Sequence, residues 1–373
     1  MALSSPPPAA ARVIRPGGNL LQGARWRSSI DRPLLQGGIT RRIFIDLPLV
    51  AAGLLLCRAA YADTMAPHYR GLERLPFKKE GYNFWKWKTH RIHYVVEGQG
   101  APVLLVHGFG ASAFHWRYNI PELAKYFKVY AMDLLGFGLS DKALVEYDPF
   151  LWREQVAAFA REVVQEPVVL VGNSIGGFTV LHTASVYPEL VSGVVLLNSS
   201  GQFESELKEK KAKPVVEETA LRRLINPIQE WGRRWLVFLT FWQAKQPSRI
   251  RSVLQNVYKD NENVDDYLVE SIVLPTKDPN AAEVYYRMMS SFMLRPSTLT
   301  MDSLLSNLSC PLLLLWGVLD PWVGPGKAEK IRAFYKDTTV VTLEAGHCPH
   351  DEAPGEVNKA LVEWISAKVS NRA

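Results

Sequence analysis

The clearest pattern along the chain is a series of short apolar runs separated by segments with helical spacing. An alternating stretch over 91–97 predicts an antiparallel edge strand. Six continuous runs follow, at 103–106, 129–132, 168–171, 194–197, 312–316 and 340–343. Runs of this kind are typical of a parallel sheet covered by helices on both faces. Ligands bind at the carboxyl ends of such strands, so we expect chemistry in the residues that follow each run.

One interval of about a hundred residues, between Asn198 and Pro311, contains no such run. Its helical spacing predicts an inserted helical cap over about 200–308. Within it, four aromatic residues at i, i+4, i+7 and i+11 share one helix face, namely Trp231, Trp235, Phe238 and Trp242. This stripe is predicted either to pack on the main domain or to roof an apolar substrate cavity. On the second interpretation, Trp235 and Phe238 are candidate substrate contacts.

The strongest chemical signal is the sequence Gly-Asn-Ser-Ile-Gly-Gly at 172–177, between an apolar run and the amphipathic stretch 178–187. It matches G-x-S-x-G in the strand–turn–helix context that gives this pattern meaning. We assign Ser174 as a nucleophile held on a strained turn, for which Gly172 and Gly176 leave room. The backbone N–H of Ile175, at the start of the following helix, is a candidate oxyanion donor.

A serine nucleophile needs a base, and the base needs an acid that orients it. Asp320 follows the run at 312–316, and His347 follows the run at 340–343. The chain order Ser, acid, His is therefore the order expected for a site built around a G-x-S-x-G turn. We assign His347 as the base and Asp320 as its orienting acid. His350 is the rival base, and Asp133 is the rival acid, although a loop-shaping role is usual at its position. Asn198 occupies another position where an acid could stand, but its amide cannot stabilise an imidazolium ion as a carboxylate does.

The loop after the first parallel strand, His107-Gly108-Phe109-Gly110, is expected to supply the second oxyanion donor. The backbone N–H of Phe109 is the candidate, together with that of Ile175. His107 is predicted to brace this loop, with a second catalytic base as the alternative. Phe114 and Trp116 follow closely and are candidate substrate contacts, and a core role for Trp116 is the alternative.

The distribution of charge changes how the composition is understood. The chain has 43 Lys and Arg against 37 Asp and Glu, a formal net charge of +6. Residues 1–60 hold eight arginines and two acids, so the rest of the chain carries 35 basic and 35 acidic side chains. A body with no net charge gives no support for a nucleic-acid partner. Three cysteines provide neither a disulfide framework nor metal-ligand spacing, so no metal is expected.

The first 62 residues are predicted to be a targeting segment, ahead of a main domain over 63–373. Residues 1–40 have the Arg-, Ser-, Ala- and Pro-rich composition of an organellar transit peptide. The pair Arg41-Arg42, the apolar run 47–57 and the cleavage-site pattern at 60–62 then resemble a twin-arginine export signal. Two signals in series predict a chloroplast protein that is transferred to the thylakoid lumen. There are two alternatives. One is a single long transit peptide, and the other is an uncleaved membrane anchor, although its apolar run is shorter than the ~20 residues that a spanning helix needs.

The set of motifs from about 82 to 365 resembles the α/β-hydrolase superfamily. Two details, the Gly-Asn-Ser-Ile-Gly-Gly-Phe at 172–178 and the Gly-His-Cys-Pro-His-Asp-Glu at 346–352, look like the plant chloroplast branch that includes pheophytinase and chlorophyll dephytylase. The resemblance implies an α/β fold with a mostly parallel eight-stranded sheet, and hydrolysis of a phytyl or other lipid ester. The serine makes dehalogenase and epoxide hydrolase activities unexpected, because those relatives use an aspartate as the nucleophile.

The expected activity is therefore that of a serine esterase that acts through an acyl-enzyme and requires no metal or organic cofactor. Its expected partner is an apolar small-molecule ester, and association with a membrane surface is one way to reach it. Hydrolysis of a C–C bond in a dienol, for which the Gly-Asn-Ser-x-Gly-Gly turn is also typical, is the alternative enzyme activity. A non-catalytic ligand-binding relative is the alternative outside enzymes. Cys348, beside the base, is either redox-sensitive or a small buried thiol.

Overall fold

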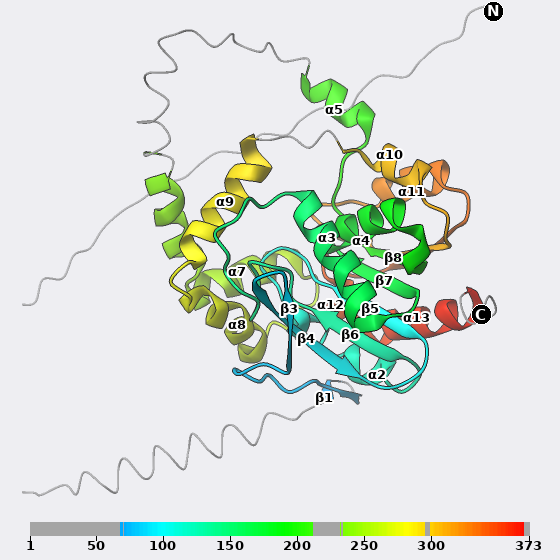
Figure 1. The fold of residues 1–373 in the computed structure, drawn as a ribbon, viewed down its shortest axis with the longest axis horizontal. Coiled ribbons are helices and arrows are strands. Elements are labelled where there is room, and N and C mark those ends of the chain that lie inside the picture. The colour runs from blue at the N-terminus through cyan, green and yellow to red at the C-terminus, as the bar shows by residue number, and fades with distance from the viewer. Residues whose placement is uncertain (1–67, 70, 212–231, 233, 295–298, 369–373) are drawn as a thin grey trace, which may run out of the picture. The chain divides into compact units, whose positions relative to one another are not determined.

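The apolar runs form the centre of one sheet in the computed structural model, which describes residues 68–69, 71–211, 232, 234–294 and 299–368 (Figure 1). Among these residues, eight strands follow the order β10-β9-β8-β7-β5-β6-β4-β3. The strands are β3 (Asn83–Trp87), β4 (His90–Glu97), β5 (Pro102–Val106), β6 (Lys128–Met132), β7 (Val168–Asn173), β8 (Val191–Leu197), β9 (Leu312–Gly317) and β10 (Thr338–Leu343). A separate antiparallel pair is formed by β1 (His68–Tyr69) and β2 (Leu72–Glu73).

Each of the six continuous runs is confirmed as a strand, from β5 to β10, and these six strands pair in parallel. The stretch at 91–97 lies in β4, which is antiparallel to its neighbours as predicted. Its position at the sheet edge was predicted wrongly, because β3 pairs along the outer side of β4. The edge strand β3 alternates between half-buried and exposed side chains over most of its length, as an outer strand does.

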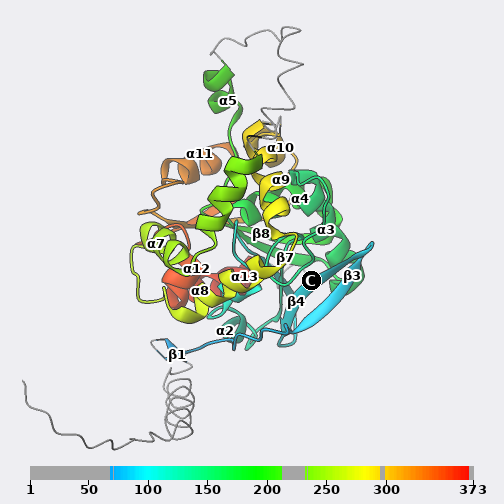
Figure 2. The same cartoon turned by 90° about the vertical axis from the view of Figure 1, so that its left-hand side faces the viewer.

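The helices cover both faces of the sheet (Figures 1 and 2). Successive strand residues alternate between two buried clusters, so that Leu104 and Val106 belong to one and Val103 and Leu105 to the other. The helices are η1 (Ala113–Trp116), α2 (Ile120–Leu123), α3 (Pro149–Phe159), η2 (Ala160–Val164), α4 (Ile175–Val186), η3 (Pro188–Leu190), α5 (Glu204–Lys211), α7 (Pro247–Val257), α8 (Asp266–Val273), η4 (Leu274–Lys277), α9 (Ala281–Leu294), α10 (Met301–Ser306), α11 (Gly326–Phe334), α12 (Pro349–Glu352) and α13 (Pro354–Lys368).

Helix α4, which follows the predicted nucleophile, is more buried than its sequence suggested. It packs on β7 and β8 and is in turn contacted by α3 and α10. None of its residues before Val186 is exposed. The prediction of an amphipathic helix was therefore wrong, because a helix enclosed by a sheet and two other helices has no solvent face to make polar.

The described residues between β8 and β9 form helices and no strand. We refer to residues 234–294, which include a helix over 234–244 together with α7, α8, η4 and α9, as the insert helices. Figure 1 shows α7, α8 and α9 grouped beside the sheet. Among the described residues, no helix is long and apolar enough to cross a membrane. Trp231 and the predicted targeting segment at 1–62 lie outside the described residues.

Candidate active site

Ser174 lies in the turn between β7 and α4, with backbone angles φ 55° and ψ −119°. A serine in this region is strained, and such strain persists only where the surroundings enforce it. Here the Ser174 N–H donates to Leu197 O at 3.1 Å, while its carbonyl accepts from Phe178 N at 3.2 Å and Ser200 N at 3.0 Å. The backbone is thus held on both sides, as a nucleophile turn requires.

The glycines around the serine are needed for space. A Cβ on Gly172 would lie 2.4 Å from Gly176 O, and one on Gly176 would lie 2.4 Å from both Val106 O and His107 O. Both distances are far inside van der Waals contact, so β7, α4 and the end of β5 approach each other more closely than any side chain allows. The prediction that Gly172 and Gly176 leave room for crowded backbone is confirmed.

The structure brings the predicted base and acid together. His347 Nδ1–H donates to Asp320 Oδ2 at 2.6 Å, and both side chains are buried. A carboxylate can only accept, so the proton is on Nδ1 and the Nε2 lone pair is left to act as a base. Burial by itself raises the pKa of Asp320, but the hydrogen bond and charge of His347 and the backbone N–H of Trp322 outweigh it. The pKa of Asp320 is therefore below its usual value, and the group stays ionised beside His347.

Two backbone contacts fix the loop that carries the base. The His347 N–H donates to Val257 O at 3.0 Å, and the Asn173 side chain donates to His347 O at 2.9 Å. The ring of Trp322 meets the imidazole edge to face, with 4.8 Å between ring centroids. His347 is thus held by Asn173 of β7, by Trp322 of the loop that carries Asp320, and by Val257 of α7.

The two predicted oxyanion donors flank the serine. Ile175 is the first residue of α4, so its N–H has no acceptor one turn earlier within the helix. Phe109 lies in the loop after β5 and lines the same cavity as Ser174. The neighbouring Gly108 packs against the serine, since a Cβ there would lie 3.3 Å from Ser174 Cβ. The two backbones are therefore adjacent to Ser174, where donors to an oxyanion would act.

The rival residues occupy structural positions. Leu134 N–H donates to His107 Nε2, and His107 Nδ1–H donates to Gly108 O at 2.7 Å, so this ring braces the loop. Asp133 accepts from Ala113 N at 2.6 Å and from His93 Nδ1 at 2.9 Å, which shapes the loop after β6. His350 is fully buried, and neither of its ring nitrogens has a hydrogen-bond partner among the described residues.

Ser174 and His347 open onto one cavity of about 480 Å³, within the usual size range of small-molecule sites. The strand-end loops supply part of its wall, and the insert helices supply the rest. Its larger apolar lining residues include Phe109, Phe137, Phe241, Leu254, Tyr285 and Met288. The lining contains Lys142, Lys245 and Arg249 but no Asp or Glu among the described residues.

None of the four predicted substrate contacts lines this cavity. Trp116 is fully buried against His350, with 4.1 Å between ring centroids, and Phe114 is buried against Phe77. Trp235 and Phe238 line a separate surface hollow beside α9. The spacing of these aromatic residues correctly grouped Trp235 with Phe238, but the structure brings neither of them to Ser174.

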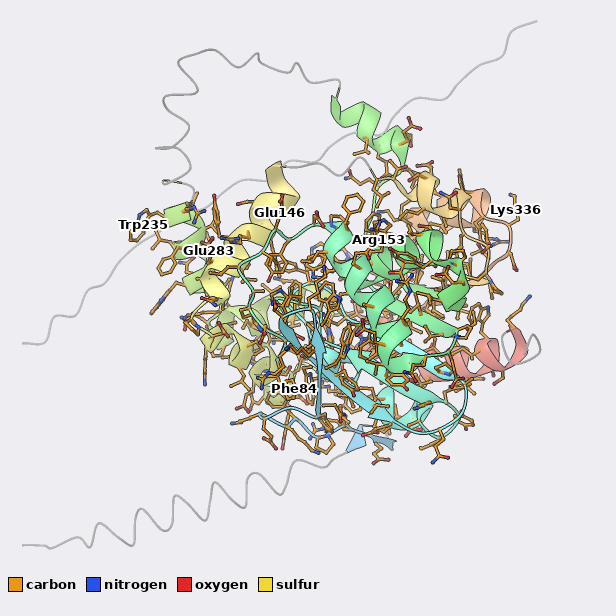
Figure 3. The ribbon with its side chains drawn as sticks, in the orientation of Figure 1. Phe84, Glu146, Arg153, Trp235, Glu283 and Lys336 are labelled. Atoms are coloured by element: carbon orange, nitrogen blue, oxygen red, sulfur yellow. The ribbon has the colours of Figure 1, made fainter. Side chains whose placement is uncertain are left out.

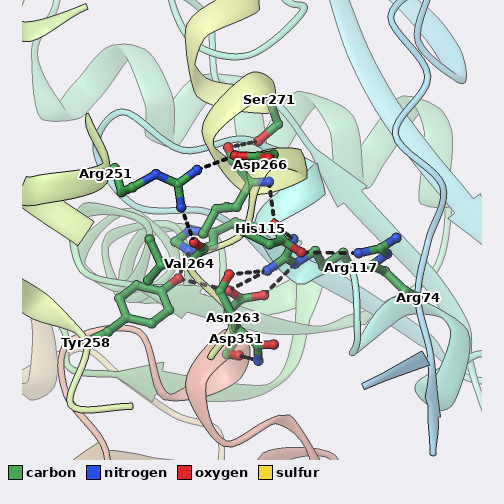
Figure 4. A network of polar contacts seen from close by, with 12 residues as sticks. Arg74, His115, Arg117, Arg251, Tyr258, Asn263, Val264, Asp266, Ser271 and Asp351 are labelled. Carbon is green, nitrogen blue, oxygen red and sulfur yellow. Dashed lines mark hydrogen bonds and ion pairs between the residues drawn. The ribbon is translucent and has the colours of Figure 1, made fainter. Parts of the chain in front are cut away.

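A buried polar network ties the insert helices to the core behind the cavity (Figure 4). Arg117, at the end of η1, donates from Nε to Asp351 Oδ1 at 2.9 Å and from Nη1 to Asp265 Oδ1 at 2.7 Å. Tyr258 O–H donates to Asp351 Oδ2 at 2.9 Å, so its oxygen accepts from His115 Nε2–H at 2.6 Å. Burial lowers the pKa of His115, which lines the cavity, to about 3, so the ring is neutral.

One supporting position was not assigned its role from the sequence. Asn198 has φ 40°, and its side chain donates to Asp320 Oδ2 at 2.8 Å while accepting from Gly317 N at 2.8 Å. It therefore holds the acid in place, and its location directly after β8 was the signal. For Cys348, the sequence left a redox-sensitive thiol and a small buried thiol as alternatives. Its side chain is buried, and burial and nearby carboxylates raise the pKa of the thiol well above the usual value, which favours the buried thiol.

Comparison with known proteins agrees with this geometry. The sequence model of the alpha/beta hydrolase family matches residues 103–360. Chloroplastic pheophytinase of Arabidopsis thaliana is 31% identical over 324 residues, which cover 75% of this chain and 65% of that protein. The 2-hydroxy-6-oxo-6-(2'-aminophenyl)hexa-2,4-dienoic acid hydrolase of Metapseudomonas resinovorans is 27% identical over 280 residues, 74% of this chain and 87% of that protein.

A solved serine hydrolase involved in carbazole degradation shares the fold, with a TM-score of 0.62 and 24% identity over 77% of this chain and 98% of that chain. The matches span most of the described residues and include the strands that carry Ser174, Asp320 and His347. The chain therefore belongs to the alpha/beta hydrolase family.

Proposed function

We propose that the protein is a serine hydrolase that cleaves a carboxylic ester of an apolar substrate through an acyl-enzyme. One observation carries this proposal. Ser174 stands on a strained turn at the edge of an apolar cavity, and the hydrogen-bonded pair of His347 and Asp320 opens onto the same cavity. Three groups of these types in this chain order are what acyl transfer needs.

The reaction proceeds in two halves. His347 Nε2 takes the Ser174 proton as Oγ attacks the ester carbonyl, and the N–H groups of Phe109 and Ile175 hold the oxyanion. The imidazolium then gives its proton to the alcohol as the C–O bond breaks. Water, deprotonated by His347, hydrolyses the acyl-enzyme and restores the serine. Asp320 stays ionised throughout and keeps the proton of the imidazole on Nδ1.

The substrate class follows from the cavity wall. Aromatic and aliphatic side chains from two regions of the chain enclose the space beside Ser174, which suits an alkyl or isoprenoid chain. The relative named pheophytinase supports a phytyl or other lipid ester as the substrate. In this proposal, residues of about 200–308 act as a cap over the alkyl or isoprenoid chain of the substrate. The substrate itself is drawn from a lipid phase.

Turnover of p-nitrophenyl esters of increasing chain length tests the proposal. We expect longer acyl chains to give higher kcat/KM, because more apolar surface enters the cavity. A fluorophosphonate probe should label the native protein and not Ser174→Ala, while Ser306→Ala, a serine of α10, serves as a matched control that remains labelled. Absence of both turnover and labelling in folded protein would refute the hydrolase proposal and leave a non-catalytic ligand-binding role.

A second candidate is cleavage of a C–C bond in a dienol. The observation that favours it is the 27% identity to a hydrolase of a hexadienoic acid over 74% of this chain. Incubation with a ring-fission dienol and with a p-nitrophenyl ester of similar size distinguishes the two activities. Consumption of the dienol at a higher kcat/KM than the ester would replace the esterase proposal.

We also propose that residues 1–62 direct the protein to the chloroplast and then to the thylakoid lumen. The arginine-rich composition of residues 1–40, followed by the pair Arg41-Arg42 and the apolar run 47–57, supports this address. Import of radiolabelled protein into isolated chloroplasts, followed by fractionation, tests it. Protein that stays in the stroma with an N-terminus far from Asp63 would contradict the lumen.

A further inference from the structure

The aromatic stripe of the insert lies on the outside of the molecule. In the helix over 234–244, the exposed fractions are 51% for Trp235, 45% for Phe238, 59% for Leu239 and 58% for Trp242. Figure 3 shows Trp235 at the outer side of the insert helices, close to Glu283 of α9. These four side chains stand at i, i+3, i+4 and i+7, so they form one continuous face. Leu236, exposed by 63%, extends it.

The opposite face of the same helix belongs to the cavity. Phe241 is only 7% exposed, and it lines the cavity together with Ala244 and Lys245. The helix therefore lies between the cavity and the outside of the molecule. Its outward face is more apolar than the face that it turns to the cavity. Soluble helices have the reverse arrangement, and a continuous exposed apolar face marks an interaction surface.

The charged residues of the chain segment that carries this face have one sign. Residues 231–259 contain six Lys or Arg and no Asp or Glu. Arg234 pairs with Glu283 and Arg251 with Asp266. Lys245 and Arg249 both line the cavity, and no carboxylate of the described residues pairs with either. The apolar face is therefore bordered by cations next to the cavity.

We propose that the outer face of the helix over 234–244 binds the surface of an anionic lipid bilayer, from which the ester enters the cavity. Exposed tryptophan and leucine on one helix, followed by Lys245 in the next turn and Arg249 in α7, are the features of a segment that lies in the interfacial region of a membrane. A bilayer fits better than a folded partner because Lys245, directly after this helix, contacts the ring of Trp242 on the outer face and also lines the cavity, where a lipid ester would be cleaved. This inference rests on the proposed esterase function and names the surface from which its substrate comes.

Co-sedimentation with vesicles tests the proposal on the full chain. The vesicles consist of phosphatidylcholine alone, or contain about one third phosphatidylglycerol. We expect binding to the anionic vesicles and about tenfold weaker binding of Leu236→Ser/Leu239→Ser, because two half-exposed leucines no longer enter the lipid. Lys245→Gln/Arg249→Gln should weaken binding to the anionic vesicles by about fivefold per cation.

Matched controls come from elsewhere on the surface. Leu144→Ser/Val186→Ser replaces two comparably exposed apolar side chains of the core domain. Arg332→Gln/Lys336→Gln removes two exposed cations, of which Lys336 lies far from Trp235 in Figure 3. Both control pairs should bind vesicles as the native chain does. Leu236→Ser/Leu239→Ser should also cleave a short soluble ester at the native rate, since neither leucine lines the cavity.

A second measurement detects insertion of this face even where another segment also binds lipid. Brominated phosphatidylcholine should quench part of the tryptophan fluorescence, and Trp242→Phe should remove a fraction of that quenching. Equal vesicle binding by native chain and leucine variant, with quenching unchanged in Trp242→Phe, would overturn the proposal. A dimer in gel filtration that the leucine variant dissociates would instead assign the face to a second copy. Failure of soluble-ester turnover, by contrast, would overturn the esterase function and not the lipid surface.

Discussion

Replacement of Arg117 by methionine is the most decisive test of how the insert helices are joined to the core. The guanidinium is fully buried and holds three partners, which are Asp351, Asp265 and the carbonyl of Asn263. The Nη2–Asn263 O distance is 2.6 Å, and a second contact to Asp351 measures 3.3 Å. Burial alone lowers the pKa of Arg117, but its two carboxylate partners raise it above the usual value, so the cation is charged.

The expected cost follows from what the substitution leaves behind. Asp351 is fully buried, and in Arg117→Met it keeps only the Tyr258 hydroxyl as a side-chain donor. Removing one partner of a buried ion pair costs about 3–5 kcal/mol, because the remaining charge is uncompensated. Asp265 is still paired with Arg74 at 3.1 Å and is partly exposed, so the loss of its contact with Arg117 adds little to the cost in stability. Burial raises the pKa of Asp351, so protonation of this carboxyl group should make the loss smaller as the pH is lowered.

Urea unfolding followed by tryptophan fluorescence measures this loss. Arg161→Met is the matched control, since Arg161 pairs with Glu189 at 3.4 Å with both side chains exposed, and such pairs contribute about 0–1 kcal/mol. The double variant Arg117→Met/Asp351→Leu should be more stable than Arg117→Met, because no charge is left unpaired. A loss below about 1 kcal/mol in Arg117→Met, equal to that of Arg161→Met, would refute this account of the network.

Three further predictions test other parts of the site. Asn198→Ala should lower kcat about 10- to 100-fold at unchanged KM, because Asp320 loses a hydrogen-bond donor that holds it in place. It should also shift the acid limb of the pH–rate profile to higher pH. A fall in stability with no change in kcat or in the pH–rate profile would refute a positioning role. Gly176→Ala should lower the free energy of unfolding in urea by about 1–3 kcal/mol or more, because the added Cβ would lie 2.4 Å from two carbonyl oxygens. Gly355→Ala is the control and should leave the free energy of unfolding unchanged, because no atom lies within 4 Å of its added Cβ. His115 has a pKa of about 3 in the folded state against 6.5, so the unfolded chain binds the extra proton, and stability falls as pH drops from 6.5 towards 3. In His115→Gln that slope should be about 1.4 kcal/mol per pH unit shallower, and an unchanged slope would contradict the buried neutral ring.

The parallel strands β5 to β9 were predictable because nearly all of their residues are buried, so each reads as a continuous apolar run. The run 103–106 shows why, since its residues belong alternately to two buried clusters. The outer strand β3 was missed as the edge because its half-exposed residues produce a mixed pattern that a loop could also have. Helix α4 was misjudged because part of its covering comes from α10, which is distant in sequence.

The candidate catalytic groups could be identified from the sequence because each is marked by local features. The turn at Ser174 needs glycines within a few residues, and Asp320 and His347 each follow a strand that can be recognised in the sequence. Asn198 was judged only as a replacement acid, because the sequence does not show that its amide lies 2.8 Å from Asp320. A supporting residue is defined by what it touches across the fold, and spacing along the chain carries no such information.

The aromatic stripe shows most clearly where sequence reasoning stops. Helical spacing establishes that Trp235, Phe238 and Trp242 share a face, but it does not establish which way that face points. Both predicted roles assumed that a large apolar face must turn inward, since burying one such side chain gains about 1.5–3 kcal/mol. In the structure the smaller face with Phe241 turns inward instead, and the larger one is about half exposed. A helix that keeps its more apolar face outward forgoes that gain in water and recovers it only where the surroundings are apolar. The orientation of this helix is therefore itself an argument for a lipid surface, independent of the charges beside it.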